Sequence, residues 1–100
     1  KNLFLNEKLT LGELADECKV SVHQLSEYLN RYESKNFAYF INKERIKYFL
    51  NLMETQKKTN VTTAALQSGF NSLSVFNSWF KKIKGTSPKK YISDNLTFKH

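Results

Sequence analysis

Apolar residues recur every three to four positions along most of the chain, with polar residues between them. This spacing is typical of amphipathic α-helices, in which residues i, i+3 and i+4 share one face. Residues 3–5 resemble the end of a helix that begins further upstream. The pattern then predicts helices over residues 11–19, 21–32 and 37–56, a short helix around Ala65 and Leu66, and helices over 72–84 and 88–95. Three glycines and one proline supply few of the turns of an all-β domain, so an all-α fold is expected.

Capping residues mark the ends of these segments. Thr10 followed by Glu13 has the spacing of a capping box, in which each side chain accepts a hydrogen bond from the other residue's amide. Gly69 and Gly85 favour the left-handed backbone that turns the chain after a helix. Hydroxyl residues ahead of the other helices are the expected N-caps: Ser21, Thr62 or Thr63, Ser72 and Ser87.

The chain contains a repeat of about fifty residues. Each unit is a short helix, a turn and a second capped helix, which is the outline of a helix-turn-helix. The matching positions, at an offset of 50 before the turn and 51 after it, are Ala15 and Ala65, Ser21 and Ser72, Leu25 and Phe76, Leu29 and Phe80, and Arg31 and Lys82. The chain therefore carries two copies of one helical motif.

The predicted helix between the two units bears apolar residues on more than one side, which suits a helix packed on two faces. It divides the chain into a first unit (1–36), a linker helix (37–56), a second unit (57–94) and a tail (95–100). A helix of about 20 residues is roughly 30 Å long, close to the roughly 34 Å between successive major-groove faces of B-DNA. Two units at this separation fit one face of a duplex. The alternative is a helical protein-interaction module with a solvated basic face.

The charge is unevenly distributed. The 100 residues are 40% hydrophobic and carry a formal net charge of +7, which indicates one folded domain with the charge on its surface. Residues 1–50 contribute +1 and residues 51–100 contribute +6. This asymmetry favours an anionic partner. No apolar stretch is long enough to span a membrane and no signal sequence opens the chain, so a cytoplasmic location and no membrane contact are expected.

Catalytic and metal chemistry find no support in the residues. Cys18, the single cysteine, cannot form an internal disulfide, and with only His23 and His100 beside it no zinc-ligand spacing exists. Paired carboxylates, a nucleophile with a base and a phosphate-binding glycine loop are also missing. We therefore expect a protein that is not an enzyme and needs no cofactor.

The chain resembles the AraC/XylS-type bacterial transcription regulators over about residues 5–92. The similarity lies in residues 9–15, in Ser21 with Leu25 and Ser26, in residues 40–46, and above all in Gly69-Phe70-Asn71-Ser72, Phe76, Phe80-Lys81-Lys82, Gly85-Thr86-Ser87-Pro88 and Tyr91. The resemblance implies about seven helices, with two helix-turn-helix subdomains joined by a long linker helix. It implies binding to double-stranded promoter DNA. Lys19 stands where this family often has glycine, and Ser78 where an arginine is frequent.

Helix phase and family position together indicate which residues contact bases. In the first unit these are His23, Ser26 and Glu27. Glu27 has two possible roles: it accepts a hydrogen bond from cytosine N4, or it forms a surface ion pair with Arg31. In the second unit the base-contacting candidates are Leu73, Ser74, Val75 and Ser78, with Leu73 and Val75 as alternatives for the small core.

Basic and short polar residues near these positions are expected on the DNA backbone. The candidates are Ser21, Arg31, Lys35, Ser72, Asn77, Lys81, Lys82, Lys84, Lys89 and Lys90. Arg45 lies among apolar residues and is expected in a structural ion pair or cap, while Trp79 is expected in the core. The resemblance implies a sensor or dimerisation region upstream, and RNA polymerase as a partner if the parent protein is an activator. A chain that starts without Met fits a piece of a longer protein.

Overall fold

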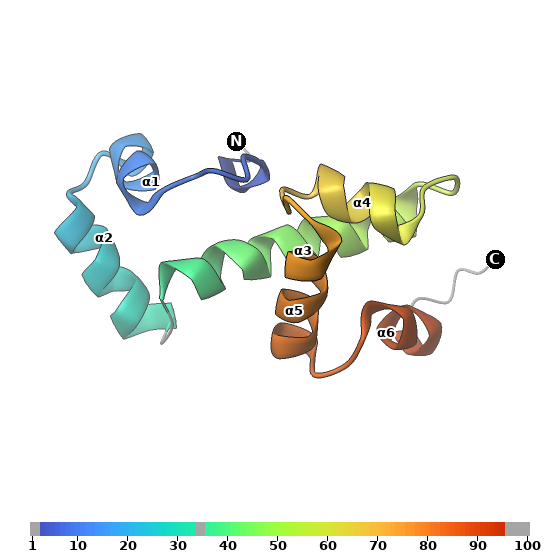
Figure 1. The fold of residues 1–100 in the computed structure, drawn as a ribbon. Helices are drawn as coiled ribbons and strands as arrows, with labels where there is room; N and C mark the ends of the chain where they lie inside the picture. Colours follow the sequence, from blue (N-terminus) through green and yellow to red (C-terminus); the bar gives the residue numbers. More distant parts are fainter. Residues whose placement is uncertain (1–2, 34–35, 96–100) are drawn as a thin grey trace.

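The computed structural model describes residues 3–33 and 36–95, and these residues contain helices and no strand. The chain begins with a 3-10 turn, η1 (Leu3–Leu5), and α2 continues into a π-helical segment, η2 (Leu29–Glu33). The α-helices are α1 (Leu11–Cys18), α2 (Val22–Tyr28), α3 (Phe37–Thr55), α4 (Val61–Gln67), α5 (Leu73–Lys84) and α6 (Pro88–Asn95) (Figure 1). The predicted all-α fold is confirmed. The molecule is elongated, with principal extents of 45 × 23 × 22 Å.

Most of the predicted caps are present. The Thr10 and Ser21 side chains each complete a capping box, with Glu13 and Gln24 respectively. Ser72 caps α5, and Gly85 ends it with φ +80°. The prediction for α4 is wrong, because its N-cap is Asn60 and not Thr62 or Thr63. The Asn60 side chain accepts from the Thr63 amide at 2.8 Å, and asparagine caps as well as serine does.

The turn in each unit contains a residue with a left-handed backbone conformation, but the residue type differs. Gly69, after α4, has φ +100°, as expected. Lys19, after α1, has φ +61° and is the one non-glycine residue with positive φ among the described residues. The first turn therefore adopts the left-handed conformation without glycine, at a cost of about 1–2 kcal/mol.

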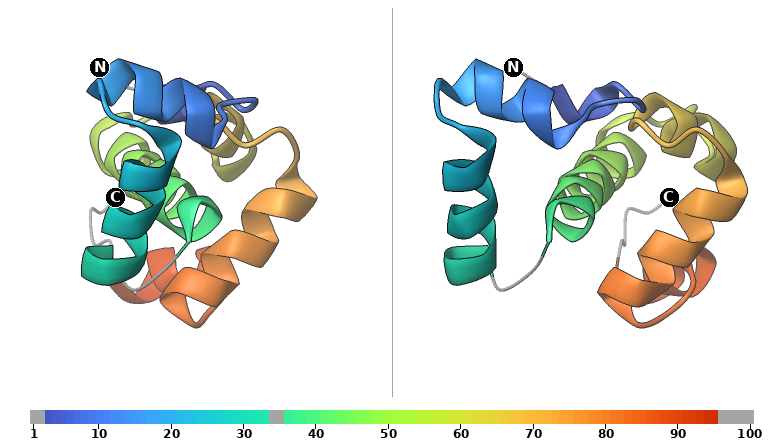
Figure 2. Two further views of the ribbon diagram at one scale, coloured as in Figure 1. Left: turned by 90° about the vertical axis from the view of Figure 1, so that its left-hand side faces the viewer. Right: turned by 60° about the vertical axis from the view of Figure 1, so that its left-hand side comes forward.

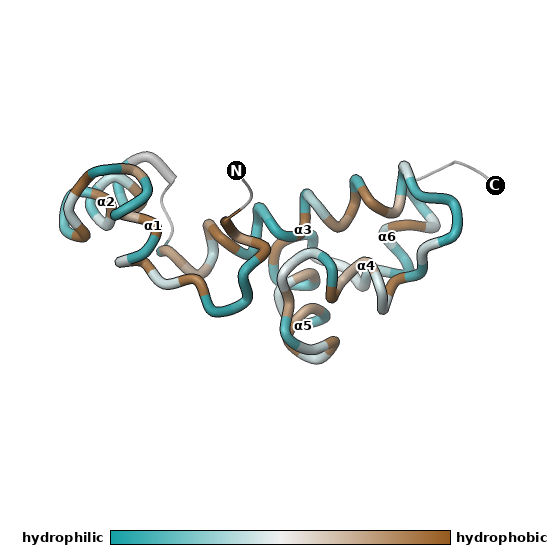
Figure 3. The backbone as a smooth tube through the Cα atoms, turned by 90° about the horizontal axis from the view of Figure 1, so that it is seen from above, coloured by the Kyte–Doolittle hydropathy of each residue, from teal (hydrophilic) through white to brown (hydrophobic). Residues whose placement is uncertain are grey.

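Two apolar clusters lie at opposite ends of α3, along which apolar and polar residues alternate (Figure 3). The first cluster is small: Ala15, Leu25 and Leu29, with Phe37 and Phe40 of α3 packed against it. The second is larger and aromatic. In it the ring of Phe49 lies 4.7 Å from that of Phe76 and 5.9 Å from that of Phe80. The linker helix thus contributes to both cores, which fixes the two units on one rigid element.

The sequence predicts structural roles for Arg45 and Trp79. Arg45 is buried and donates hydrogen bonds to the carbonyls of Phe4 and Asn6 and to Oδ1 of Asn42. Its role is structural, as expected: it caps carbonyls, and it forms no ion pair with the residues that the structure describes. Burial lowers the pKa of Arg45, and the nearby charge of Glu7 opposes this shift. Trp79 is half-buried against the second core.

Candidate nucleic-acid interface

The two repeated units place their second helices in comparable positions. In each unit the first helix, α1 or α4, is followed by a short turn and by α2 or α5. Both views in Figure 2 show α2 and α5 extending from the level of α1 and α4, past α3, in the same general direction. The second helices of the two units, α2 and α5, therefore run alongside each other on either side of α3.

The outer face of α2 is polar and exposed. Leu25 and Leu29 are buried, so His23 and Glu27 lie on the opposite side of the helix and are exposed. Asn30, at the start of η2, is exposed as well. Ser26 is half-buried and lines a small pocket with Leu11, Leu29 and Phe37. Of the predicted base-contacting residues of the first unit, His23 and Glu27 are thus central and Ser26 lies at the edge.

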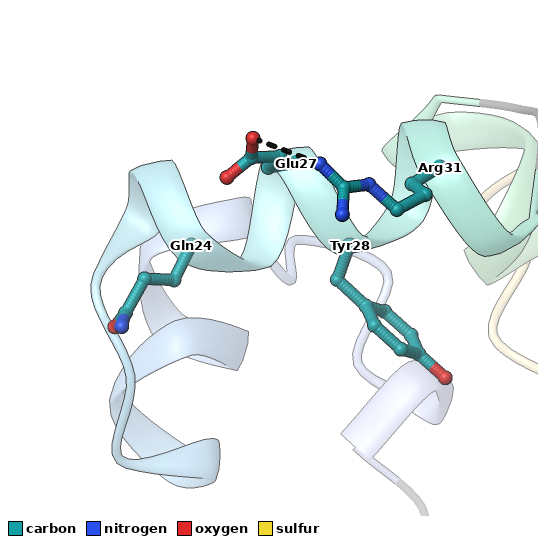
Figure 4. Close-up of a pocket in the computed structure, with 4 residues that line it drawn as sticks. All are labelled: Gln24, Glu27, Tyr28 and Arg31. Atoms are coloured by element: carbon teal, nitrogen blue, oxygen red, sulfur yellow. Dashed lines mark hydrogen bonds and ion pairs between the residues drawn. The ribbon is translucent and has the colours of Figure 1, made fainter.

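Glu27 and Arg31 interact directly. Arg31 Nη2 lies 3.4 Å from Glu27 Oε2, and the two side chains are 63% and 58% exposed (Figure 4). Gln24 and Tyr28 complete an open pocket with this pair. Sequence reasoning did not name these two residues as contacts. The signal was present, because residues 24, 27, 28 and 31 follow the i, i+3, i+4, i+7 spacing of one helix face.

The outer face of α5 is formed by short polar residues. Phe76 and Phe80 are fully buried, while Ser74, Asn77 and Ser78 are exposed. The two predicted apolar contacts of this helix differ. Val75 is 40% exposed, whereas Leu73 is half-buried and packs against the second core.

The lysines after this face are exposed, and their partners differ. Lys82 Nζ lies 4.9 Å from the centre of the Trp79 ring, and Lys84 Nζ lies 5.3 Å from that of Tyr91. Lys90 pairs with Asp94 at 3.1 Å. Lys81 and Lys89 make no ion pair with any described residue. Lys81, Lys82 and Lys84 lie in the last turn of α5, where their positive charges interact favourably with the negative end of the helix dipole.

The serine caps at the helix starts already accept one hydrogen bond each. Ser21 Oγ accepts from the Gln24 amide at 3.0 Å, and Ser72 Oγ accepts from the Val75 amide at 3.1 Å. A hydroxyl group keeps its own proton for a further acceptor, such as a phosphate oxygen. Lys35, the remaining backbone candidate, lies outside the described residues.

Comparison with known proteins agrees with this geometry. A family model described as a helix-turn-helix domain matches residues 14–94, and it covers both units. The chain belongs to the AraC-type helix-turn-helix family. Membership gives this AraC-type domain its general function, which is DNA binding as the output domain of a transcription regulator.

Individual relatives of this AraC-type domain share about a quarter to a third of its residues. The uncharacterised HTH-type transcriptional regulator YdeC of Bacillus subtilis is 32% identical over 90 residues, which are 90% of this chain and 31% of YdeC. The chain therefore spans about a third of the length of that curated relative. The C-terminal domain of AraT, a response regulator from Geobacillus stearothermophilus, has a similar fold, with a TM-score of 0.78, 23% identity and coverage of 98% of this chain and 82% of that one.

A DNA-binding transcriptional dual regulator from Escherichia coli K-12 has the same fold, with a TM-score of 0.75 and 24% identity over 93% of this chain and 82% of that one. Among the described residues of the AraC-type domain, no helix is both long and apolar enough to cross a membrane. The same residues contain no group of three or more His, Cys, Asp or Glu side chains placed to hold a metal ion.

Proposed function

We propose that this domain binds a specific promoter duplex by inserting α2 and α5 into two successive segments of the major groove. One observation carries the proposal: two copies of the motif are held on one helix, α2 and α5 run in the same general direction (Figure 2), and each of them carries exposed polar residues. A major groove about 12 Å wide admits one helix. Two helices on a fixed spacer therefore suit two groove segments.

The dimensions support this arrangement. α3 has 19 residues, which corresponds to a length of about 28 Å at 1.5 Å per residue. The whole molecule extends 45 Å along its longest axis. Successive major-groove faces of B-DNA are about 34 Å apart, so one molecule reaches two of them without a second copy.

The two recognition faces favour different contacts. On α2, Glu27 accepts a hydrogen bond from cytosine N4, and Arg31 lies beside it to balance the carboxylate charge near phosphates. His23 is the second base-contacting residue of this helix, with Ser26 at the margin. On α5, Ser74 and Ser78 are the polar base contacts, and short side chains of this kind leave more of the specificity to DNA shape.

The basic residues contribute affinity for any duplex. Lys81 and Lys89, without an ion-pair partner among the described residues, are the simplest phosphate contacts. Lys82 is held over the Trp79 ring and stays exposed, which keeps its ammonium group close to the outer face of α5. Ser72, Asn77, Lys84 and Lys90 are further backbone contacts near this helix, and Val75 is a base-contact candidate on it. Leu73 contributes packing at its start.

Titration with a duplex at several salt concentrations tests the proposal. We expect the double substitution of Lys81→Ala and Lys82→Ala to make the slope of log K against log salt less steep by about two. Each phosphate contact contributes about 0.9 to the steepness of this slope. Lys57→Ala with Lys58→Ala is the matched control, since this pair is exposed between α3 and α4 and removes the same charge. Undetectable duplex binding by the wild type at about 50 mM salt, or equal slopes for both pairs, contradicts the proposal.

The remaining functions concern the parent protein. We propose that a sensor or dimerisation region in the parent protein controls this domain, in the bacterial cytoplasm where the promoter DNA is found. RNA polymerase is the further partner if the parent protein activates transcription. Nothing in this site requires catalysis or a cofactor.

A further inference from the structure

Residues 4–6, at the start of the described chain, pack against the linker helix α3. Arg45 Nε donates to the Phe4 carbonyl at 2.6 Å and Nη2 donates to the Asn6 carbonyl at 2.9 Å. The Phe4 ring also meets the Tyr48 ring edge-on, with ring centres 6.1 Å apart. Residues 4–6 are therefore fixed on the middle of α3.

The same segment touches the turn that leads into α5. A Cβ at Gly69 would lie 2.5 Å from the Phe4 carbonyl oxygen, 2.9 Å from Arg45 Nε and 3.0 Å from Leu5 Cα. The backbone of η1 is thus in direct contact with the left-handed turn. The guanidinium of Arg45 also lies 5.9 Å from the centre of the Phe70 ring.

The contacts continue from this turn into α5. The Phe70 ring meets the Phe76 ring of α5 edge-on, with ring centres 5.2 Å apart. Ser72, two residues after Phe70, caps α5 through the Val75 amide. The direction in which α5 leaves the turn is therefore set by groups that pack on η1 and Arg45.

We propose that Arg45 is a positioning residue for DNA recognition: it holds η1 against the Gly69 turn, and η1 in turn sets the orientation of α5 relative to α3. The chain before α1 thus acts on the second recognition helix and leaves α2 unaffected. This inference rests on the proposed function for its effect on DNA, while its structural part is independent of it.

The chemistry of Arg45 explains why this junction has one arrangement. The guanidinium is a planar fork, and here it bonds the carbonyl of Phe4 in η1, the carbonyl of Asn6 just after η1 and the Asn42 amide oxygen at once. The group is buried, so moving η1 away leaves a buried cation without these partners. A lysine keeps the charge but has no fork, and it cannot span the three acceptors.

Amide hydrogen exchange of the free protein is the first test. Arg45→Lys lowers the protection of amides 76–84 in α5 by about tenfold or more, the effect of losing one hydrogen bond to a charged group, and leaves amides 25–28 in α2 unchanged. Phe4→Ala gives the same pattern more weakly and decides the question if Arg45→Lys does not fold. Equal loss of protection in α2 and α5, or none in α5, overturns the proposal.

Hydroxyl-radical footprinting then tests the effect on DNA, on a duplex that the wild type selects from a random pool. An iron chelate on Cys18, the single cysteine, which is exposed in the first unit, marks the half-site bound by α2. Arg45→Lys and Phe4→Ala lose protection at the other half-site. Leu29→Ala, which opens the first core, is the matched control and loses the half-site beside Cys18.

The outcomes separate the two hypotheses. Loss of both half-sites to the same extent in Arg45→Lys and Phe4→Ala overturns the positioning role. A wild-type footprint with fewer than two half-sites overturns the proposed function. In that case the exchange experiment still decides whether η1 and Arg45 hold α5.

Discussion

Gly69 and Gly85 form a natural pair for measuring what the junction at η1 contributes to stability. Both glycines have positive φ, +100° and +80°, in the second unit. A Cβ at Gly69 would lie 2.5 Å from the Phe4 carbonyl oxygen, whereas a Cβ at Gly85 would meet nothing within 4 Å. Gly69→Ala therefore adds backbone strain and a clash, and Gly85→Ala adds backbone strain alone.

The expected magnitudes follow from these contacts. Positive φ costs an alanine about 1–2 kcal/mol, and this applies at both positions. At Gly69 the Phe4 carbonyl must also move, which breaks a hydrogen bond to the buried Arg45 and adds about 1.5–3 kcal/mol. We expect Gly69→Ala to lower the free energy of unfolding by about 2.5–5 kcal/mol, a large share of the roughly 5–15 kcal/mol typical of a domain. The smaller freedom of the unfolded alanine chain is the same in both variants and cancels.

Urea unfolding gives the free energy of unfolding of both variants, and heating gives their thermal midpoints, with circular dichroism as the signal in both experiments. The thermal midpoint of Gly85→Ala should fall by about 5–15 °C and that of Gly69→Ala by at least twice as much, since 1 kcal/mol corresponds to about 4–8 °C here. If Gly69→Ala is no less stable than Gly85→Ala, the close contact between η1 and the second turn does not exist in solution.

Two further substitutions test other parts of the structure. Asn60→Ala removes the cap of α4 and should lower the free energy of unfolding by about 0.5–2 kcal/mol, while Thr62→Ala changes it by less than about 0.5 kcal/mol. Equal effects of these two substitutions in urea unfolding would contradict the assigned cap. Glu27→Gln breaks the exposed ion pair with Arg31, which contributes only about 0.2–0.5 kcal/mol to stability. The substitution also replaces a carboxylate that accepts from cytosine with an amide that pairs with adenine. Selection from a random pool should therefore show one changed base position, and an unchanged preference would remove Glu27 from the set of base contacts.

The features that were predicted from the sequence are those set by nearby residues. The capping box at Thr10, the N-cap at Ser21, the buried pair Leu25 and Leu29, and the turn at Gly69 all depend on spacings of four residues or fewer and on backbone preference. The α4 cap was misassigned because Asn60 belongs to a polar segment, while two threonines stand nearer the apolar residues.

The features that were missed depend on distant contacts. The bonds from Arg45 to the carbonyls of Phe4 and Asn6 join residues about forty positions apart, and no local sequence pattern predicts them. Ser26 lies at the edge of its face because the start of α3, at Phe37, packs beside it. Lys19 adopts a backbone conformation that its residue type disfavours, in a turn where the Val20 amide donates to the Ala15 carbonyl at 3.1 Å.

The central claim is that α3 holds two recognition helices at a fixed distance for two groove segments of one duplex. The most direct test measures the affinity of the wild type for a selected duplex and for the same duplex with 5 base pairs inserted between the half-sites. B-DNA turns once in about 10–10.5 base pairs, so the insertion moves one half-site to the opposite face. We predict that the affinity falls by about 10³-fold, toward the level of non-specific binding. An unchanged affinity would contradict the account.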